Sequence, residues 1–192
     1  MINIISGDST MKMILTSKGF TTKYMFSIIQ EKLDKPIEQV KILFIPTALF
    51  GKNKEEKLLK GLINLGFNKD NIICFNHLEV EKYRNLNLDV IYGCGGNTFL
   101  LLKLIKESGF DKDIIQYVKN GVIYIGASAG THLVTKNIEH ILEIDCNEVG
   151  LTDFKGLGLF DRIIFCHYCE ERQTVNICGL PEVKFTYSGD SI

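Results

Sequence analysis

The sequence lacks both a long apolar run and an excess of positive charge. No apolar run reaches the roughly 18 residues that a membrane helix needs, so we expect no membrane span. The formal net charge is −1, which provides no basic footprint for nucleic acid. Residues 1–8 lack the basic-then-apolar pattern of a secretory signal. We therefore expect a cytoplasmic protein that binds neither membrane nor nucleic acid.

Clusters of cysteine at metal-ligand spacing are also scarce. The six cysteines are scattered along the chain: Cys74, Cys94, Cys146, Cys166, Cys169 and Cys178. Only Cys166 and Cys169 are spaced as a ligand pair, whereas a structural zinc site usually brings two such pairs. In a chain of this length without a secretory signal, we expect the cysteines to remain thiols.

What the sequence does have is an alternation of short β-rich runs with longer helical stretches. The 192 residues, of which 45% are hydrophobic, suit a single domain over residues 1–192 with its own core. The alternation is typical of an α/β fold, a three-layer sandwich with helices on both faces of a mostly parallel sheet. The expected strands are 3–5, 41–45, 71–75, 89–92, 122–125 and 162–166. The expected helices are 22–33, 53–65, 97–107, 111–119 and 129–135, while 136–158 allows short strands or an excursion.

Ser128 lies in the turn Gly126-Ala127-Ser128-Ala129-Gly130, between an expected strand and an expected helix. This context is the one that a nucleophile elbow requires. Small neighbours allow the strained backbone that displays the hydroxyl at the carboxyl edge of the sheet. The N-terminus of the following helix points its N–H groups at a developing oxyanion. We interpret Ser128 as the nucleophile of a serine hydrolase; the alternative is a glycine-rich turn needed only for packing.

Among the four histidines, His167 is the leading candidate for the base, because it follows an expected strand at a carboxyl edge. His132 is only four residues past Ser128, so we expect it to point elsewhere. The turn 93–97, Gly-Cys-Gly-Gly-Asn, follows another expected strand. Three uses of this turn stay open: binding a phosphate through its N–H groups, donating a second hydrogen bond to an oxyanion, or serving only as a tight strand-to-helix turn. It lacks the Lys-Ser/Thr ending of a P-loop.

Six short motifs occur in order along the chain: 44–48 (FIPTA), 95–99 (GGNTF), 124–130 (YIGASAG), 156–159 (GLGL), 167–168 (HY) and 179–182 (GLPE). Together and in this order they resemble the dipeptidase E (aspartyl dipeptidase) family of serine peptidases, relatives of cyanophycinase with a class I glutamine-amidotransferase-like fold. The resemblance implies a triad of Ser128, His167 and Glu182, with backbone N–H groups of Gly96 and Ala129 as the oxyanion hole. It implies cleavage of short peptides through an acyl-enzyme, which needs no metal or organic cofactor.

The chain departs from the family after His167. Only 15 residues separate His167 from Glu182, where the family has a longer stretch that helps to build the substrate pocket. Asn97 and Arg172 are the candidates for substrate contact, and Cys166 stands where a proline often precedes the histidine. The shortened stretch favours, as the alternative function, a catalytically silent binding or regulatory protein on the same fold. An amidotransferase-like cysteine nucleophile is disfavoured because the elbow carries serine. We expect a monomer or a homodimer.

Overall fold

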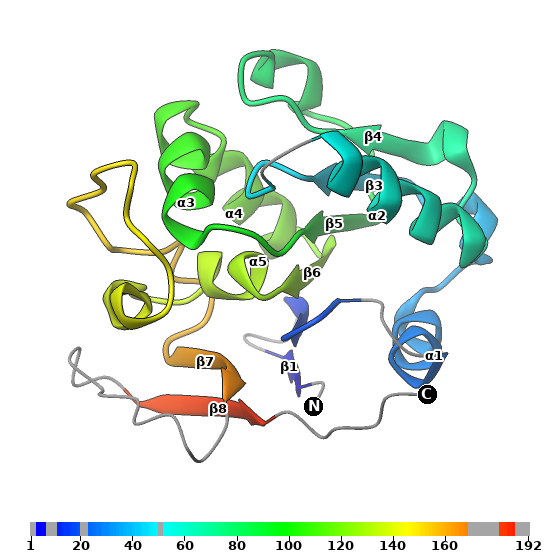
Figure 1. The fold of residues 1–192 in the computed structure, drawn as a ribbon. Coiled ribbons are helices and arrows are strands. Elements are labelled where there is room, and N and C mark those ends of the chain that lie inside the picture. The colour runs from blue at the N-terminus through cyan, green and yellow to red at the C-terminus, as the bar shows by residue number, and fades with distance from the viewer. Residues whose placement is uncertain (1–2, 7–10, 20–22, 50–51, 169–180, 187–192) are drawn as a thin grey trace.

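A six-stranded sheet forms the centre of the molecule in the computed structural model, which describes residues 3–6, 11–19, 23–49, 52–168 and 181–186 (Figure 1). The strand order is β1-β2-β6-β5-β3-β4. The strands are β1 (Asn3–Ser6), β2 (Lys12–Thr16), β3 (Ile42–Ile45), β4 (Ile72–Cys74), β5 (Val90–Gly93) and β6 (Ile123–Ala127). All neighbouring strands pair in parallel except β1, which pairs antiparallel with β2. The expected α/β fold with a mostly parallel sheet is confirmed.

Helices cover both faces of this sheet because successive strand side chains point to opposite sides. The helices are α1 (Lys23–Lys32), α2 (Lys52–Asn64), α3 (Thr98–Glu107), α4 (Asp111–Lys119) and α5 (Ala129–Leu133). One buried cluster packs Phe44 and Tyr92 against α1 and α2, and the other packs Leu43 and Ile91 against α3, α4 and α5. None of the helices in the described ranges is long and apolar enough to cross a membrane.

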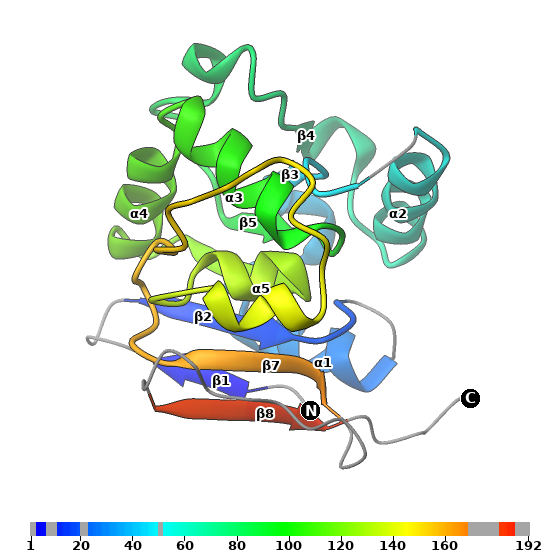
Figure 2. The same cartoon turned by 60° about the vertical axis from the view of Figure 1, so that its left-hand side comes forward.

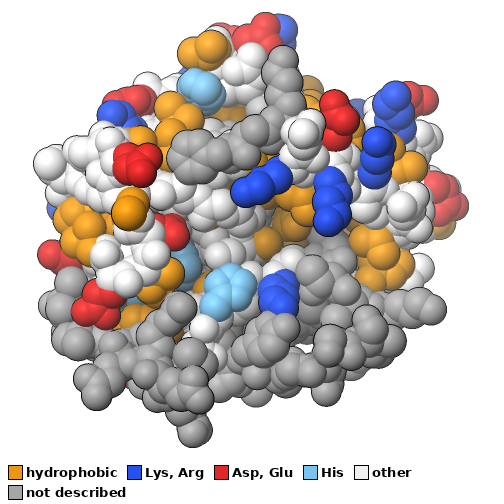
Figure 3. Space-filling view, viewed as in Figure 1, with side chains coloured by type: hydrophobic (Ala, Val, Ile, Leu, Met, Phe, Trp, Pro, Cys, Tyr) orange, Lys and Arg blue, Asp and Glu red, His pale blue; other side chains and the backbone are white. Residues whose placement is uncertain are grey.

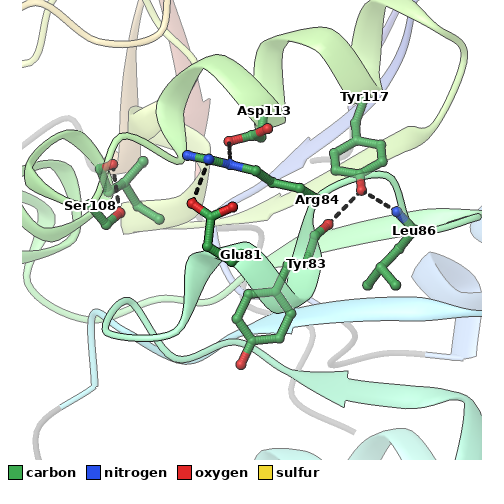
Figure 4. Close-up of polar contacts among 8 residues, drawn as sticks. Glu81, Tyr83, Arg84, Leu86, Ser108, Asp113 and Tyr117 are labelled. Atoms are coloured by element: carbon green, nitrogen blue, oxygen red, sulfur yellow. Dashed lines mark hydrogen bonds and ion pairs between the residues drawn. The ribbon is translucent and has the colours of Figure 1, made fainter.

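The connection that precedes β5 is fastened to α4 by side chains (Figure 4). Arg84 Nε donates to Asp113 Oδ2 at 3.2 Å. The Tyr117 hydroxyl donates to the Tyr83 carbonyl at 2.5 Å and accepts from the Leu86 amide at 2.7 Å. These contacts fix the approach to β5, and β5 in turn carries the glycine turn at the site.

The strand expected at 162–166 is present as β7 (Ile163–Tyr168), but its partner lies outside the central sheet. It pairs in parallel with β8 (Glu182–Thr186) in a separate two-stranded sheet. Figure 2 shows β7 and β8 side by side. The base expected from the sequence therefore lies on a second, smaller sheet.

The ambiguous segment 136–158 forms a short 3-10 helix, η4 (Glu139–Glu143), followed by a loop that crosses over α3 (Figure 2). Lys103 Nζ donates to the Val149 carbonyl at 2.9 Å, and Lys106 pairs with Asp153 at 2.8 Å. This loop holds α3 from outside, and its Asp145 accepts from the first amide of that helix. The excursion allowed for by the sequence thus serves to anchor α3.

Candidate active site

Ser128 occupies a sharp turn between β6 and α5 with φ 49° and ψ −107°, a conformation that non-glycine residues rarely adopt. The two glycines of the turn make room for it. A Cβ on Gly126 would lie 2.8 Å from the Thr131 backbone, and a Cβ on Gly130 would lie 2.1 Å from the Gly93 carbonyl oxygen. The small residues therefore let α5 start directly against the sheet, which is the geometry of a nucleophile elbow.

The carboxyl end of β2 holds this strained turn in place. The Ser128 amide donates to the Thr16 carbonyl at 2.9 Å, and the Thr131 hydroxyl donates to the same oxygen at 2.7 Å. The Thr16 side chain is fully buried and donates from its hydroxyl to the Gly126 carbonyl at 3.0 Å. Sequence reasoning missed both β2 and Thr16, although Met13-Ile14-Leu15 before Thr16 is an apolar run typical of a buried strand.

The structure brings His167 to Ser128. The His167 Nε2 and Ser128 Oγ atoms lie 3.1 Å apart, within the reach that a general base needs. His167 also has a positive φ of 55°, and its amide donates to Ser17 Oγ at 3.2 Å. Thr16 and Ser17, at the end of β2, thus fix the backbones of both Ser128 and His167.

The glycine turn after β5 lies beside the serine. A Cβ on Gly95 would lie 3.4 Å from Ser128 Cβ, and Gly96 has a φ of 141° with no room for a Cβ against the Ala48 carbonyl. Ala129 is the first residue of α5, where amides have no partner within the helix. The segments of Gly96 and Ala129 therefore meet at Ser128, as an oxyanion hole would require.

Glu182 lies toward the other end of the small sheet. It begins β8, where its Cα pairs with that of Ile163. His167 lies four residues further along β7, about 13 Å at a strand rise of about 3.3 Å per residue. The structure thus brings Ser128 and His167 together and does not set Glu182 beside His167, so its role as the triad acid stays a prediction.

The two candidates for substrate contact have different outcomes. Asn97 caps α3: its Oδ1 accepts from the Leu100 amide and its Nδ2 donates to the Cys146 carbonyl, both at 2.9 Å. Each polar atom of the side chain therefore makes one hydrogen bond within the protein and can make another, so its contact with substrate stays a prediction. Arg172 lies outside the described residues.

Two other histidines and two buried thiols lie near Ser128 and His167, and Cys166 Sγ is 4.0 Å from the Ser128 carbonyl oxygen. His132 is buried and lies with Nδ1 3.2 Å from Thr98 Oγ1, so its ring contacts the start of α3. Burial raises the pKa of the Cys166 thiol to about 12, and burial likewise raises that of Cys94 well above its ordinary value. Both are therefore inert thiols at neutral pH. Cys74, Cys94, Cys146 and Cys166 are all free, as expected.

The candidate site is located by its side chains and their geometry and not by the volume of a cavity. A cavity of about 540 Å³ lies at the amino-terminal ends of the strands, lined by residues such as Lys12, Asp89 and Ile123. It contains none of the candidate site residues. On the face seen in Figure 3, a hollow lies near the middle, with Lys and Arg side chains along its border.

The fold and site define a class of protein: an α/β domain whose parallel sheet presents a serine on a strained strand-to-helix turn, with a histidine at hydrogen-bond distance. The model of peptidase family S51 matches residues 13–178. The chain belongs to peptidase family S51, and the expected resemblance to dipeptidase E is confirmed.

Individual relatives agree with this assignment. An uncharacterized peptidase of Listeria innocua is 34% identical over 139 residues, which cover 66% of this chain and 64% of that protein. Peptidase E of Shigella flexneri is 36% identical over 150 residues, covering 76% of this chain and 62% of that protein. The chain thus spans less than two thirds of the length of these relatives.

Solved structures support the fold. A Listeria monocytogenes protein assigned to peptidase E superposes with a TM-score of 0.68 at 30% identity, covering 81% of this chain and 78% of that one. A peptidase from an actinobacterium gives a TM-score of 0.59 at 19% identity over 81% of this chain and 67% of its own, which supports the fold alone.

Proposed function

We propose that this chain hydrolyses peptide bonds in short peptides through an acyl-enzyme, with Ser128 as nucleophile and His167 as general base. The observation that carries the proposal is the 3.1 Å separation of Ser128 Oγ and His167 Nε2 at a strained elbow. A backbone held at a positive φ is costly, and such strain is concentrated at functional sites. Membership of peptidase family S51 supports the same reaction class.

The reaction follows from these positions. His167 Nε2 accepts the Ser128 proton as Oγ attacks the peptide carbonyl carbon, and the carbonyl oxygen becomes an oxyanion. The Gly96 and Ala129 amides donate to that oxyanion, each lowering the barrier by about 3 kcal/mol. His167 then gives its proton to the leaving amine, and water, activated by the same histidine, releases the acyl group from Ser128. The resemblance to dipeptidase E implies that Glu182 orients His167, whereas the strand register sets the two residues about 13 Å apart along the small sheet, so the scheme relies on Ser128, His167 and the two amides.

A fluorophosphonate probe tests the proposal, because it reacts only with an activated serine hydroxyl. We expect the wild type to be labelled on the peptide that contains Ser128, and both Ser128→Ala and His167→Ala to remain unlabelled. Against a panel of dipeptides, Ser128→Ala should lower the turnover of any cleaved substrate by a factor on the order of 10⁶. A folded wild type that neither reacts with the probe nor cleaves any dipeptide would point to the silent binding protein instead.

A further inference from the structure

Two hydrogen bonds bracket the glycine turn of the proposed oxyanion hole. Two residues before Gly96, the Cys94 carbonyl accepts from the Gly130 amide at 3.0 Å. Two residues after Gly96, Thr98 Oγ1 and His132 Nδ1 lie 3.2 Å apart. Both bonds join the turn after β5 to helix α5, which begins at the second donor amide. The spacing of the two donor amides is therefore fixed on both sides of the turn.

The second of these bonds lies in the core. Thr98 is 1% exposed and His132 3%. Burial keeps the pKa of His132 well below its ordinary value, with smaller contributions from His140 and His167, so its ring is neutral at neutral pH. Asp145 Oδ2 accepts from the Thr98 amide at 2.9 Å, which fixes the other side of the threonine. A hydrogen bond in such dry surroundings is strong and demands a defined geometry.

A second buried histidine extends the contact toward the base. The rings of His132 and His140 meet edge to face with centroids 5.9 Å apart. His140 Nε2 lies 2.9 Å from the Ile164 carbonyl, which can only accept, so this nitrogen carries the proton. Ile164 is three residues before His167 on β7. The two rings therefore connect the glycine turn and α5 with β7, the strand that carries His167.

We propose that Thr98 and His132 are positioning residues for the hydrolysis: their buried hydrogen bond holds the Gly96 amide at the separation from the Ala129 amide that an oxyanion requires. The inference rests on the proposed function, because it concerns the oxyanion hole of that reaction. Both residues act through the backbone segments that they join and not through contact with the peptide.

The test uses the rate of Ser128 labelling by the fluorophosphonate probe, separated into the maximal rate of inactivation and the probe concentration at half-maximal rate. Thr98→Val keeps the shape of the side chain and removes the hydroxyl. We expect it to lower the maximal rate about tenfold to a hundredfold while the half-maximal concentration stays unchanged. Thr98→Ser, which keeps the hydroxyl, should restore the rate to within about twofold of the wild type.

The matched control is Thr135→Val, which removes another buried threonine hydroxyl, one that donates to the His132 carbonyl at 2.7 Å. It should lower thermal stability about as much as Thr98→Val does and leave the labelling rate unchanged. From the other side of the bond, His132→Leu should slow labelling as Thr98→Val does. His132→Asn should not, because its amide reaches the place of Nδ1.

Each possible result of these comparisons either supports the positioning role of Thr98 and His132 or overturns it. If Thr98→Val labels as fast as Thr135→Val, or His132→Asn as slowly as His132→Leu, the positioning role is wrong. Should Thr98→Val fail to fold, the two His132 variants decide by the same comparison. A wild type that is not labelled at Ser128 overturns the proposed function itself, and that result is distinct from a labelled wild type whose variants do not differ.

Discussion

At the scale of single residues, the site depends on two side chains whose backbones are strained. Ser128 and His167 both have a positive φ, and neither is glycine. Such conformations cost on the order of 1–3 kcal/mol each and persist only where the surroundings determine them. The Thr16 carbonyl accepts from the Ser128 amide, and the Ser17 hydroxyl accepts from the His167 amide. These two hydrogen bonds hold the strained backbones in place. The end of β2 is therefore as much a part of the candidate site as Ser128 and His167 are.

For Glu182, the role that the resemblance implies disagrees with the position that the strand register gives it. Because Glu182 pairs with Ile163 at the start of β7, we expect Glu182→Gln to change the rate of Ser128 labelling only about twofold. A true triad acid would cost a factor of about 10⁴ when replaced by its amide. The measurement is labelling kinetics of Glu182→Gln beside His167→Ala, with both proteins checked for folding. A loss near 10⁴ would instead identify Glu182 as the triad acid.

At the scale of elements, the turn between β6 and α5 depends on close backbone packing. A Cβ at Gly130 would lie 2.1 Å from the Gly93 carbonyl oxygen, so the helix cannot sit against β5 if any side chain is added. We expect Gly130→Ala to lower the free energy of unfolding by about 1–3 kcal/mol or more and to abolish labelling of Ser128. Urea unfolding monitored by circular dichroism measures the first effect.

Gly61 provides the control for that substitution. It lies within α2, and a Cβ there would meet nothing within 4 Å. Gly61→Ala should therefore raise the free energy of unfolding by about 0.5–1 kcal/mol, because alanine is the better helix former. If Gly130→Ala and Gly61→Ala changed the free energy of unfolding equally, close backbone packing at the elbow would not be the reason for a glycine at position 130.

Local sequence patterns predict most helices and strands and point to Ser128 and His167 as a pair. They do not predict which strands pair with one another. The strand-to-helix turn at Ser128 follows from its neighbours in sequence, so it could be predicted. The strand β7 was also predicted, but an apolar run does not say which sheet it joins. The register that moves Glu182 away from His167 is a long-range property of that second sheet. The hydrogen bond between Thr98 and His132 could not be predicted, because the two residues lie 34 positions apart on different helices.

At the scale of the whole molecule, the site is assembled from segments that are distant along the chain. Residues 16–17, 95–98, 128–132 and 167 meet where parallel strands end, which is where α/β proteins place their sites. Three of these segments follow strands of the central sheet, and the fourth ends β7 of the smaller one. The position of the smaller sheet against the larger one therefore sets the distance between His167 and Ser128.

The buried histidines between these segments also link the stability of the whole molecule to pH. Burial lowers the pKa of both His132 and His140, while the bond to Ile164 partly opposes the shift for His140. The unfolded chain then binds more protons than the folded one below about pH 6.5, so the free energy of unfolding falls as the pH falls. Each histidine contributes a slope of up to about 1.4 kcal/mol per pH unit between its unfolded and folded pKa values.

Urea unfolding at several pH values from 7.5 to about 5 measures this slope. We expect the wild type to lose stability throughout the range below about pH 6.5. His132→Leu removes one of the two groups, so its curve should be flatter by up to about 1.4 kcal/mol per pH unit, whatever its stability at neutral pH. Thr135→Val, which leaves both rings in place, should keep the wild-type slope. Parallel curves for the wild type and His132→Leu would mean that the folded protein protonates His132 as readily as the unfolded chain does, and that its ring is not held neutral by burial.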